Sequence, residues 1–271
     1  MPTKYGDIIA FTCLSLLFMT IVNVAFYLFA PSLLGAVIPL EMFIPLISAI
    51  ITNRFITKRS LRDFGLKKGT FAIKYVLFAV VFPLCAVFLG SILGILFGLN
   101  VDLTLSGFFA EIQLKAQELN IPYEALLLAV MIQLIIAPFF NTLFAFGEEA
   151  GWRGFLLGRL EEECGRLKAI LLSGFIWGIW HYPLILLFGY DYTYETRFLG
   201  LLVFLLFVIP LGFILSWLRF KTDSVLLPSL GHGAVNAYIG FGTYTVLAER
   251  VVGFPAGVLA GISTVSYTHL R

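Results

Sequence analysis

Charged residues are scarce in this chain. Asp, Glu, Lys and Arg make up 13% of its 271 residues, whereas a soluble domain carries about a quarter. Hydrophobic residues make up 60% of the sequence, and the mean hydropathy is +0.97. This balance excludes an ordinary soluble domain and predicts an all-α polytopic membrane protein. Its surroundings should be a lipid bilayer, and we expect no nucleic-acid partner.

Cysteine and histidine are scarce as well. The three cysteines, Cys13, Cys85 and Cys164, are scattered, with no spacing typical of a disulfide framework or a metal site. The three histidines do not form the His-Glu-x-x-His signature of a zinc site. Neither pattern indicates a cofactor or a standard zinc motif.

Long apolar runs, by contrast, recur along the whole chain. A membrane helix needs about 20 mostly apolar residues. Candidate spans are residues 8–29, 34–52, 71–98, 125–147, 168–188, 199–218, 225–245 and 251–266, of which the last is short. The first lacks a small-x-small cleavage site, so we predict a retained helix. No internal repeat or linker divides the chain, which predicts a single domain, 1–271, built as a bundle of about eight transmembrane helices.

Basic residues alternate between the predicted connections. The second, fourth and sixth connections hold Arg54, Lys58, Arg59, Arg62, Lys67, Lys68, Lys74, Arg153, Arg159, Arg166, Lys168, Arg219 and Lys221. The first, third, fifth and seventh hold only Lys115, Arg197 and Arg250. The positive-inside rule then places the N-terminus and the even-numbered connections in the cytoplasm, with the protein in the cell membrane. It also predicts that the Glu-Glu stretch described below faces the cytoplasm.

Residues 105–119 read as an amphipathic helix rather than a span. Apolar residues recur there at helical spacing, with Glu111, Lys115 and Glu118 on other faces, and Ser106 is placed to cap the start. This pattern is typical of one interfacial helix on the outer side, or of an ordinary amphipathic connector.

Two adjacent carboxylates and an arginine follow a long apolar run at Glu148, Glu149 and Arg153. Ionisable residues beside hydrocarbon are costly, so they need compensation. Glu149 and Arg153 are four residues apart on one helical face, which predicts an ion pair. Glu148 is turned about 100° away and stays free for chemistry. Several nearby glycines, Gly147, Gly151, Gly154 and Gly158, should let another helix approach closely.

Polar residues on other predicted spans could meet Glu148. Asn141 lies two turns before it on the same face, and an interhelical hydrogen bond is its simplest role. Pro138 should loosen that helix and free a carbonyl. In the next span, Trp177 precedes His181 by one turn and should pack on its ring near an irregularity at Pro183.

The seventh span adds His232 and Asn236, which share one helical face. Together they could hold an oxyanion or a metal, or make a structural polar contact. Carboxylate and imidazole are the groups that activate water, and two further donors could stabilise a tetrahedral oxyanion. Among the other acids, Glu41 is an intramembrane candidate without a companion motif. The remainder read as solvated or loop residues, namely Glu161–Glu163, Asp191, Glu195 and Asp223.

The ordered set resembles the type II CAAX prenyl endopeptidases, a family that includes bacteriocin-processing and self-immunity membrane proteins. The resemblance rests on Glu148-Glu149-x-x-x-Arg153, Trp177-x-x-x-His181 and His232-x-x-x-Asn236, and it covers about residues 125–245 as a catalytic core. It implies that Glu148 and His181 activate water. It also implies that His232 and Asn236 stabilise the oxyanion and that Glu149 and Arg153 support them. Trp177 stands where the family often has Phe.

The resemblance implies an intramembrane glutamate-type endopeptidase that needs no metal. Its partner would be a hydrophobic or lipidated peptide, or a prenylated protein. Two alternatives stay open from the residues alone. Glu148, His181 and His232 could bind a catalytic zinc ion. The protein could also be non-catalytic, either as a proton or ion pathway or as a peptide-immunity scaffold.

Overall fold

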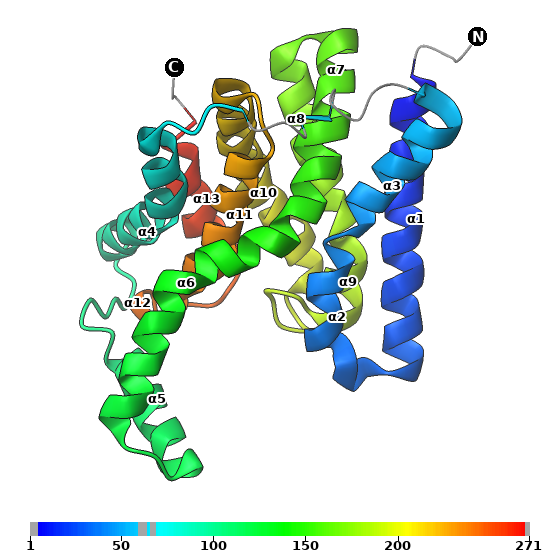
Figure 1. Cartoon of the computed structure of the whole chain (residues 1–271). Helices are drawn as coiled ribbons and strands as arrows, with labels where there is room; N and C mark the ends of the chain where they lie inside the picture. The colour runs from blue at the N-terminus through cyan, green and yellow to red at the C-terminus, as the bar shows by residue number, and fades with distance from the viewer. Residues whose placement is uncertain (1–4, 59–63, 66–68, 269–271) are drawn as a thin grey trace.

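The computed structural model describes residues 5–58, 64–65 and 69–268, and these residues form a helical bundle (Figure 1). The first half comprises α1 (Gly6–Phe29), η1 (Pro31–Leu33), α2 (Leu34–Glu41), α3 (Ile44–Thr52), η2 (Asn53–Thr57), α4 (Ile73–Leu96) and α5 (Ser106–Leu119). The centre comprises α6 (Tyr123–Glu149), η4 (Ala150–Leu156), α7 (Leu157–Cys164), α8 (Arg166–Trp180) and α9 (Tyr182–Phe188). The last part comprises α10 (Arg197–Thr222), α11 (Leu226–Tyr238), η5 (Ile239–Phe241), α12 (Gly242–Thr245) and α13 (Val258–Val265).

The prediction of an all-α polytopic membrane protein is confirmed, but the count of eight spans is not. Among the described residues, five helical stretches are long and apolar enough to cross a membrane: Gly6–Phe29, Ile73–Leu96, Tyr123–Cys164, Arg166–Phe188 and Arg197–Thr222. A sixth arises if the pair Pro31–Glu41 and Ile44–Ile56, bent by 51°, counts as one broken span.

The two C-terminal stretches predicted as spans contain only short helices. α11 has 13 residues, which at about 1.5 Å per residue is roughly 20 Å, well short of a hydrocarbon core of about 30 Å. Nearly all of α11 is buried by its neighbours, so its apolar side chains face protein rather than lipid. The last stretch holds only the eight-residue α13, because the backbone before it turns through Gly253 and Pro255.

One end of the bundle gathers the basic connections, and we name it the basic end. It comprises the start of α1, residues 53–58, 64–65 and 69–73, the α7–α8 junction and the α10–α11 connection. Contacts join these parts: Arg159 pairs with Asp7 at 3.3 Å, and Thr70 N donates to Thr222 O at 2.8 Å. Four basic residues of the second connection, Arg59, Arg62, Lys67 and Lys68, lie outside the described residues, as does His269.

Acidic residues outnumber basic ones at the opposite end, and we name it the acidic end. It comprises α5 with its flanking segments, the α9–α10 loop and residues 239–257. Here Asp102 N donates to Thr245 O at 2.8 Å, and the Tyr244 hydroxyl donates to Glu111 at 2.7 Å. Figure 1 shows the N-terminus and α7 at one end and α5 at the other.

The amphipathic segment does form a helix, α5, whose buried residues are Phe108, Ile112 and Ala116. The prediction that Ser106 caps it is wrong. The Asp102 carboxylate accepts from the backbone N–H of Ser106 at 2.8 Å, so the acid four residues upstream satisfies the helix start.

Two helix contacts position the centre of the bundle. An added Cβ on Gly147 would lie 2.6 Å from the Met42 carbonyl, so α6 passes directly against the α2–α3 break. The predicted close approach is also found at Gly151 and Gly154, but Gly158 has nothing within 4 Å. On its other side α6 packs on α11, where Gly233 approaches the Pro138 carbonyl in the same way.

Pro138 has the predicted consequence for the backbone of α6. A proline has no N–H, so the carbonyl four residues earlier, Leu134 O, loses its helical partner. The Tyr238 hydroxyl of α11 donates to this oxygen at 3.0 Å. The freed carbonyl thus becomes part of the α6–α11 contact.

Candidate functional site

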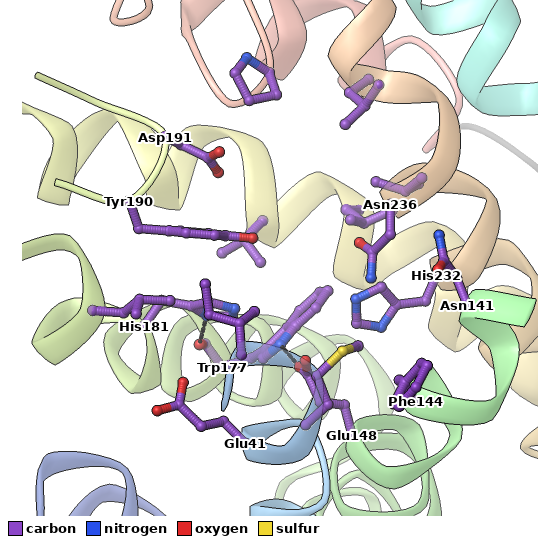
Figure 2. Close-up of a pocket in the computed structure, with 18 of the residues that line it drawn as sticks. Glu41, Asn141, Phe144, Glu148, Trp177, His181, Tyr190, Asp191, His232 and Asn236 are labelled. Atoms are coloured by element: carbon purple, nitrogen blue, oxygen red, sulfur yellow. Dashed lines mark hydrogen bonds between the residues drawn. The ribbon is translucent and has the colours of Figure 1, made fainter. Parts of the chain in front are cut away.

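A cavity of about 530 Å³ lies inside the bundle and collects polar residues from separate elements (Figure 2). Its polar lining consists of Glu41, Asn141, Glu148, Trp177, His181, Tyr190, Asp191, His232 and Asn236. The remaining wall is mostly apolar and aromatic, with Phe140, Phe144 and Phe204 among its members. The structure therefore brings the predicted residues Glu148, His181, His232 and Asn236 to one space.

Glu148 is held by two indole groups. Trp177 Nε1 donates to Glu148 Oε2 at 2.6 Å, and Trp152 Nε1 donates to the same oxygen at 3.3 Å. The residue is only 2% exposed, and its carboxylate lies at the wall of the cavity. Because both hydrogen bonds fall on Oε2, the other oxygen remains for a ligand in the cavity.

Glu149 points away from the cavity and forms the predicted ion pair. Arg153 Nη1 donates to Glu149 Oε1 at 2.9 Å, with both side chains at most 1% exposed. The guanidinium carbon also lies 4.2 Å from the centre of the Trp177 ring. The same Oε1 accepts from His232 Nδ1 at 2.9 Å. Glu149 therefore neutralises Arg153 and orients His232, whose Nε2 is left for the cavity.

His181 has a defined tautomer in this arrangement. Its Nδ1 lies 2.9 Å from the Trp177 carbonyl oxygen, which can only accept, so Nδ1 carries the hydrogen. Nε2 of the neutral ring then has a free lone pair. The predicted packing on Trp177 is confirmed, with ring centres 6.0 Å apart. The predicted irregularity is also present, since α8 ends at Trp180 and α9 begins at Tyr182.

Trp177 connects the two groups that are candidates for water activation. Its side chain donates to Glu148, and its backbone carbonyl accepts from His181. Both bonds are drawn as dashed lines in Figure 2. The sequence predicted only a packing role for Trp177. Its hydrogen bond with Glu148 joins two helices and residues 29 positions apart, so no local sequence pattern indicates it.

The two asparagines differ in their surroundings. Asn141 Nδ2 donates to Gly233 O at 3.4 Å, which confirms the predicted interhelical bond between α6 and α11. Asn236 is exposed to the cavity on the same face of α11 as His232. The Asn236 amide is therefore available to bind a ligand in the cavity.

Three cavity residues were not part of the predicted site. Glu41, considered without a companion, lies at the α2–α3 break and accepts from Asn23 Nδ2 at 3.1 Å. Tyr190 stacks on His181 with ring centres 6.3 Å apart and planes 19° from parallel. Asp191 is a loop residue as predicted, but the expectation that it joins no constellation was wrong, because it lines the cavity with the site residues. Glu195 and Asp223 stay outside it.

Burial changes the acid–base behaviour of the loop that carries Tyr190 and Asp191. Desolvation raises the pKa of the Asp191 carboxyl to about 7, and Arg250 opposes this only in part. The Asp191 charge, with burial, raises the pKa of the Tyr190 phenol well above its ordinary value. The phenol is therefore a hydrogen-bond donor at neutral pH.

The zinc alternative required Glu148, His181 and His232 to converge on one ion. Within the part of the chain that the structure describes, no three His, Cys, Asp or Glu side chains are placed to share a metal. The Nδ1 atoms of His181 and His232 are bonded to Trp177 and Glu149, so only the two Nε2 atoms are available in the cavity. The spacing of the three side chains in this structure, rather than their chemistry, therefore does not match a three-ligand zinc site.

These features define a class: a polytopic membrane protein with a buried carboxylate–imidazole site inside its helical bundle. Residues 124–238 match the family described as type II CAAX prenyl endopeptidase Rce1-like. The chain is also 33% identical over 102 residues to CAAX prenyl protease 2 of Methanococcus maripaludis. That alignment covers 36% of this chain and 37% of the relative, so it spans little more than a third of either protein. The resemblance predicted from the motifs is confirmed over the segment that holds the site.

Proposed function

We propose that this protein is a membrane-embedded endopeptidase that cleaves hydrophobic peptides with water activated by Glu148 and His181. The observation that supports it best is the double contact of Trp177, which holds the carboxylate and the imidazole in one cavity. The match to Rce1-like proteins over residues 124–238 supports the same reaction. No metal takes part in this proposal, and no cofactor is required.

The proposed reaction balances as a simple hydrolysis. The free oxygen of Glu148 accepts a proton from water, while Nε2 of His181 accepts a hydrogen bond from it and orients it. The hydroxide adds to the peptide carbonyl. Asn236 Nδ2 donates to the resulting oxyanion, and His232, held at Nδ1 by Glu149, assists from Nε2. When the C–N bond breaks, Glu148 returns its proton to the departing amine.

The apolar wall of the cavity sets the class of substrate. Aromatic and aliphatic side chains surround the polar residues, so the peptide beside the scissile bond should be hydrophobic or carry a lipid. A prenylated protein tail and an unmodified hydrophobic peptide both satisfy this requirement.

The test is mass spectrometry of a prenylated CAAX peptide and its unmodified counterpart after incubation with purified protein. Loss of a general base typically slows a reaction about 10²–10⁴-fold, so Glu148→Gln should abolish detectable cleavage. The matched control is Glu124→Gln, an exposed acid in the first turn of the same helix, which should cleave like wild type. Undiminished cleavage by Glu148→Gln would end the proposal.

A further inference from the structure

The cavity lies at a definite depth between the two ends of the bundle. α8 starts at the basic end and reaches His181 fifteen residues after Arg166, about 22 Å along its axis. α11 starts at the same end, and Asn236 lies ten residues after Leu226, about 15 Å along. The reactive groups are therefore far from the basic end.

The outer lining comes from the acidic end. Tyr190 and Asp191 belong to the α9–α10 loop, and Gly240 and Pro255 belong to the segment that follows α11. The Tyr192 hydroxyl donates to Ala256 O at 2.8 Å and ties these two connections together. None of the described residues in the basic-end connections lines the cavity.

Toward the basic end the structure is closed by large side chains. Trp152 and Phe155 of η4 follow directly after the two glutamates and are at most 1% exposed. Phe11 of α1 contacts both, with ring centres 5.4 Å from Trp152 and 5.1 Å from Phe155, and Phe64 lies 5.2 Å from Phe155. This layer of buried rings lies between the basic end and Glu148.

The charge of the two ends gives their orientation. The acidic end holds only three basic residues, Lys115, Arg197 and Arg250, whereas most of the other lysines and arginines lie at or next to the basic end in sequence. Lysine and arginine concentrate in cytoplasmic connections. The basic end, with the N-terminus, therefore belongs in the cytoplasm.

We infer that the cavity opens on the non-cytoplasmic face, and that the substrate is a hydrophobic peptide segment already exposed on that face. This inference rests on the proposed function for the reaction itself. The sequence predicted that both the N-terminus and the site face the cytoplasm. The inference keeps the N-terminus in the cytoplasm but places the opening of the site on the opposite face. A tail lipidated in the cytoplasm would be on the wrong side of the membrane, whereas a translocated peptide or the outer terminus of a membrane protein would reach the cavity directly.

Cysteine labelling tests the access route without any need for catalysis. Cys13, Cys85 and Cys164 are first replaced by alanine. Single cysteines are then introduced as Gly240→Cys at the cavity and Gly158→Cys at the basic end, because an added Cβ meets nothing within 4 Å at either glycine. A membrane-impermeant maleimide should label Gly240→Cys in intact cells and Gly158→Cys only after permeabilisation. Any other pattern in intact cells overturns the inference.

Cleavage from each side forms the second arm. The hydrophobic peptide probe, unmodified or prenylated, is supplied either outside right-side-out vesicles or trapped within them, with Glu148→Gln as the blank. Cleavage should occur only with the probe outside. Cleavage of the trapped probe alone overturns the inference and leaves the proposed function standing. If wild type cleaves from neither side, the proposed function fails while the labelling still decides the direction of access.

Discussion

The ion pair between Arg153 and Glu149 offers a quantitative test of what holds the site in place. Arg153→Met removes the cation and keeps most of the side-chain length. The Glu149 carboxylate, which is fully buried, then loses the donor that lies 2.9 Å from its Oε1. An uncompensated charge in a low-dielectric interior typically costs about 3–5 kcal/mol. The substitution also removes the contact of the guanidinium with the Trp177 ring, which lowers the stability further.

A loss of this size is measurable by thermal unfolding in detergent. One kcal/mol shifts the melting temperature of a medium-sized protein by about 2–4 °C, so Arg153→Met should melt roughly 10 °C below wild type. Adding Glu149→Gln removes the orphaned charge, because a buried pair replaced on both sides is often neutral in free energy. The double variant should therefore melt well above the single one.

The matched control is another short ion pair in a different environment. Lys115 and Glu118 are 2.7 Å apart, closer than the buried pair, but their side chains are 59% and 64% exposed. Exposed pairs contribute little, so Lys115→Met should leave the melting temperature unchanged. An Arg153→Met protein that melts within 2 °C of wild type, or a double variant no more stable than the single one, would refute the assigned role of burial.

Three further outcomes are expected. Trp177→Phe should lower kcat/KM about 10–100-fold, because a hydrogen bond to a charged group contributes about 1.5–3 kcal/mol. Trp180→Phe is the control and should change kcat/KM less than about twofold, because its indole nitrogen has no hydrogen-bond partner among the described residues. Equal effects of the two substitutions would refute the role of the Trp177 hydrogen bond in holding Glu148. Cleavage should survive exhaustive chelation; loss that is restored by zinc would support the zinc alternative. Burial raises the pKa of Asp191 to about 7, so native protein binds more protons than unfolded protein between about pH 4 and pH 7, and stability should fall as the pH rises through this window. Asp191→Asn should flatten that dependence, and parallel melting curves of the two proteins across the window would contradict it.

The sequence was informative about the fold where apolar length reflects lipid contact. α1, α4 and α10 are long, and many of their apolar side chains are exposed on the bundle surface. It misled at 225–245, where Leu227, Leu230 and Val235 are apolar because they pack against neighbouring helices. Hydropathy does not distinguish a side chain that faces lipid from one that faces the protein interior, so the short α11 was predicted as a membrane span.

Within the site, the local features could be predicted and the distant ones could not. The pairing of Glu149 with Arg153 follows from a spacing of four residues on one helix. The contact between Trp177 and Glu148 depends on how α8 packs against α6, which no spacing encodes. Asp191 belongs to a loop whose path over the cavity is set by tertiary contacts such as that of Tyr192 with Ala256.

The adjacent glutamates differ because they stand on a boundary between dry core and cavity. Glu149 faces the packed side, where Arg153 neutralises it and His232 adds a second hydrogen bond to the same oxygen. Glu148 faces the cavity, where neutral indole donors hold one oxygen without cancelling its charge. A cation at the position of Trp177 would stabilise the carboxylate further and weaken it as a proton acceptor. The indole donors fix the geometry of Glu148 and leave it basic, which is what the proposed reaction requires of it.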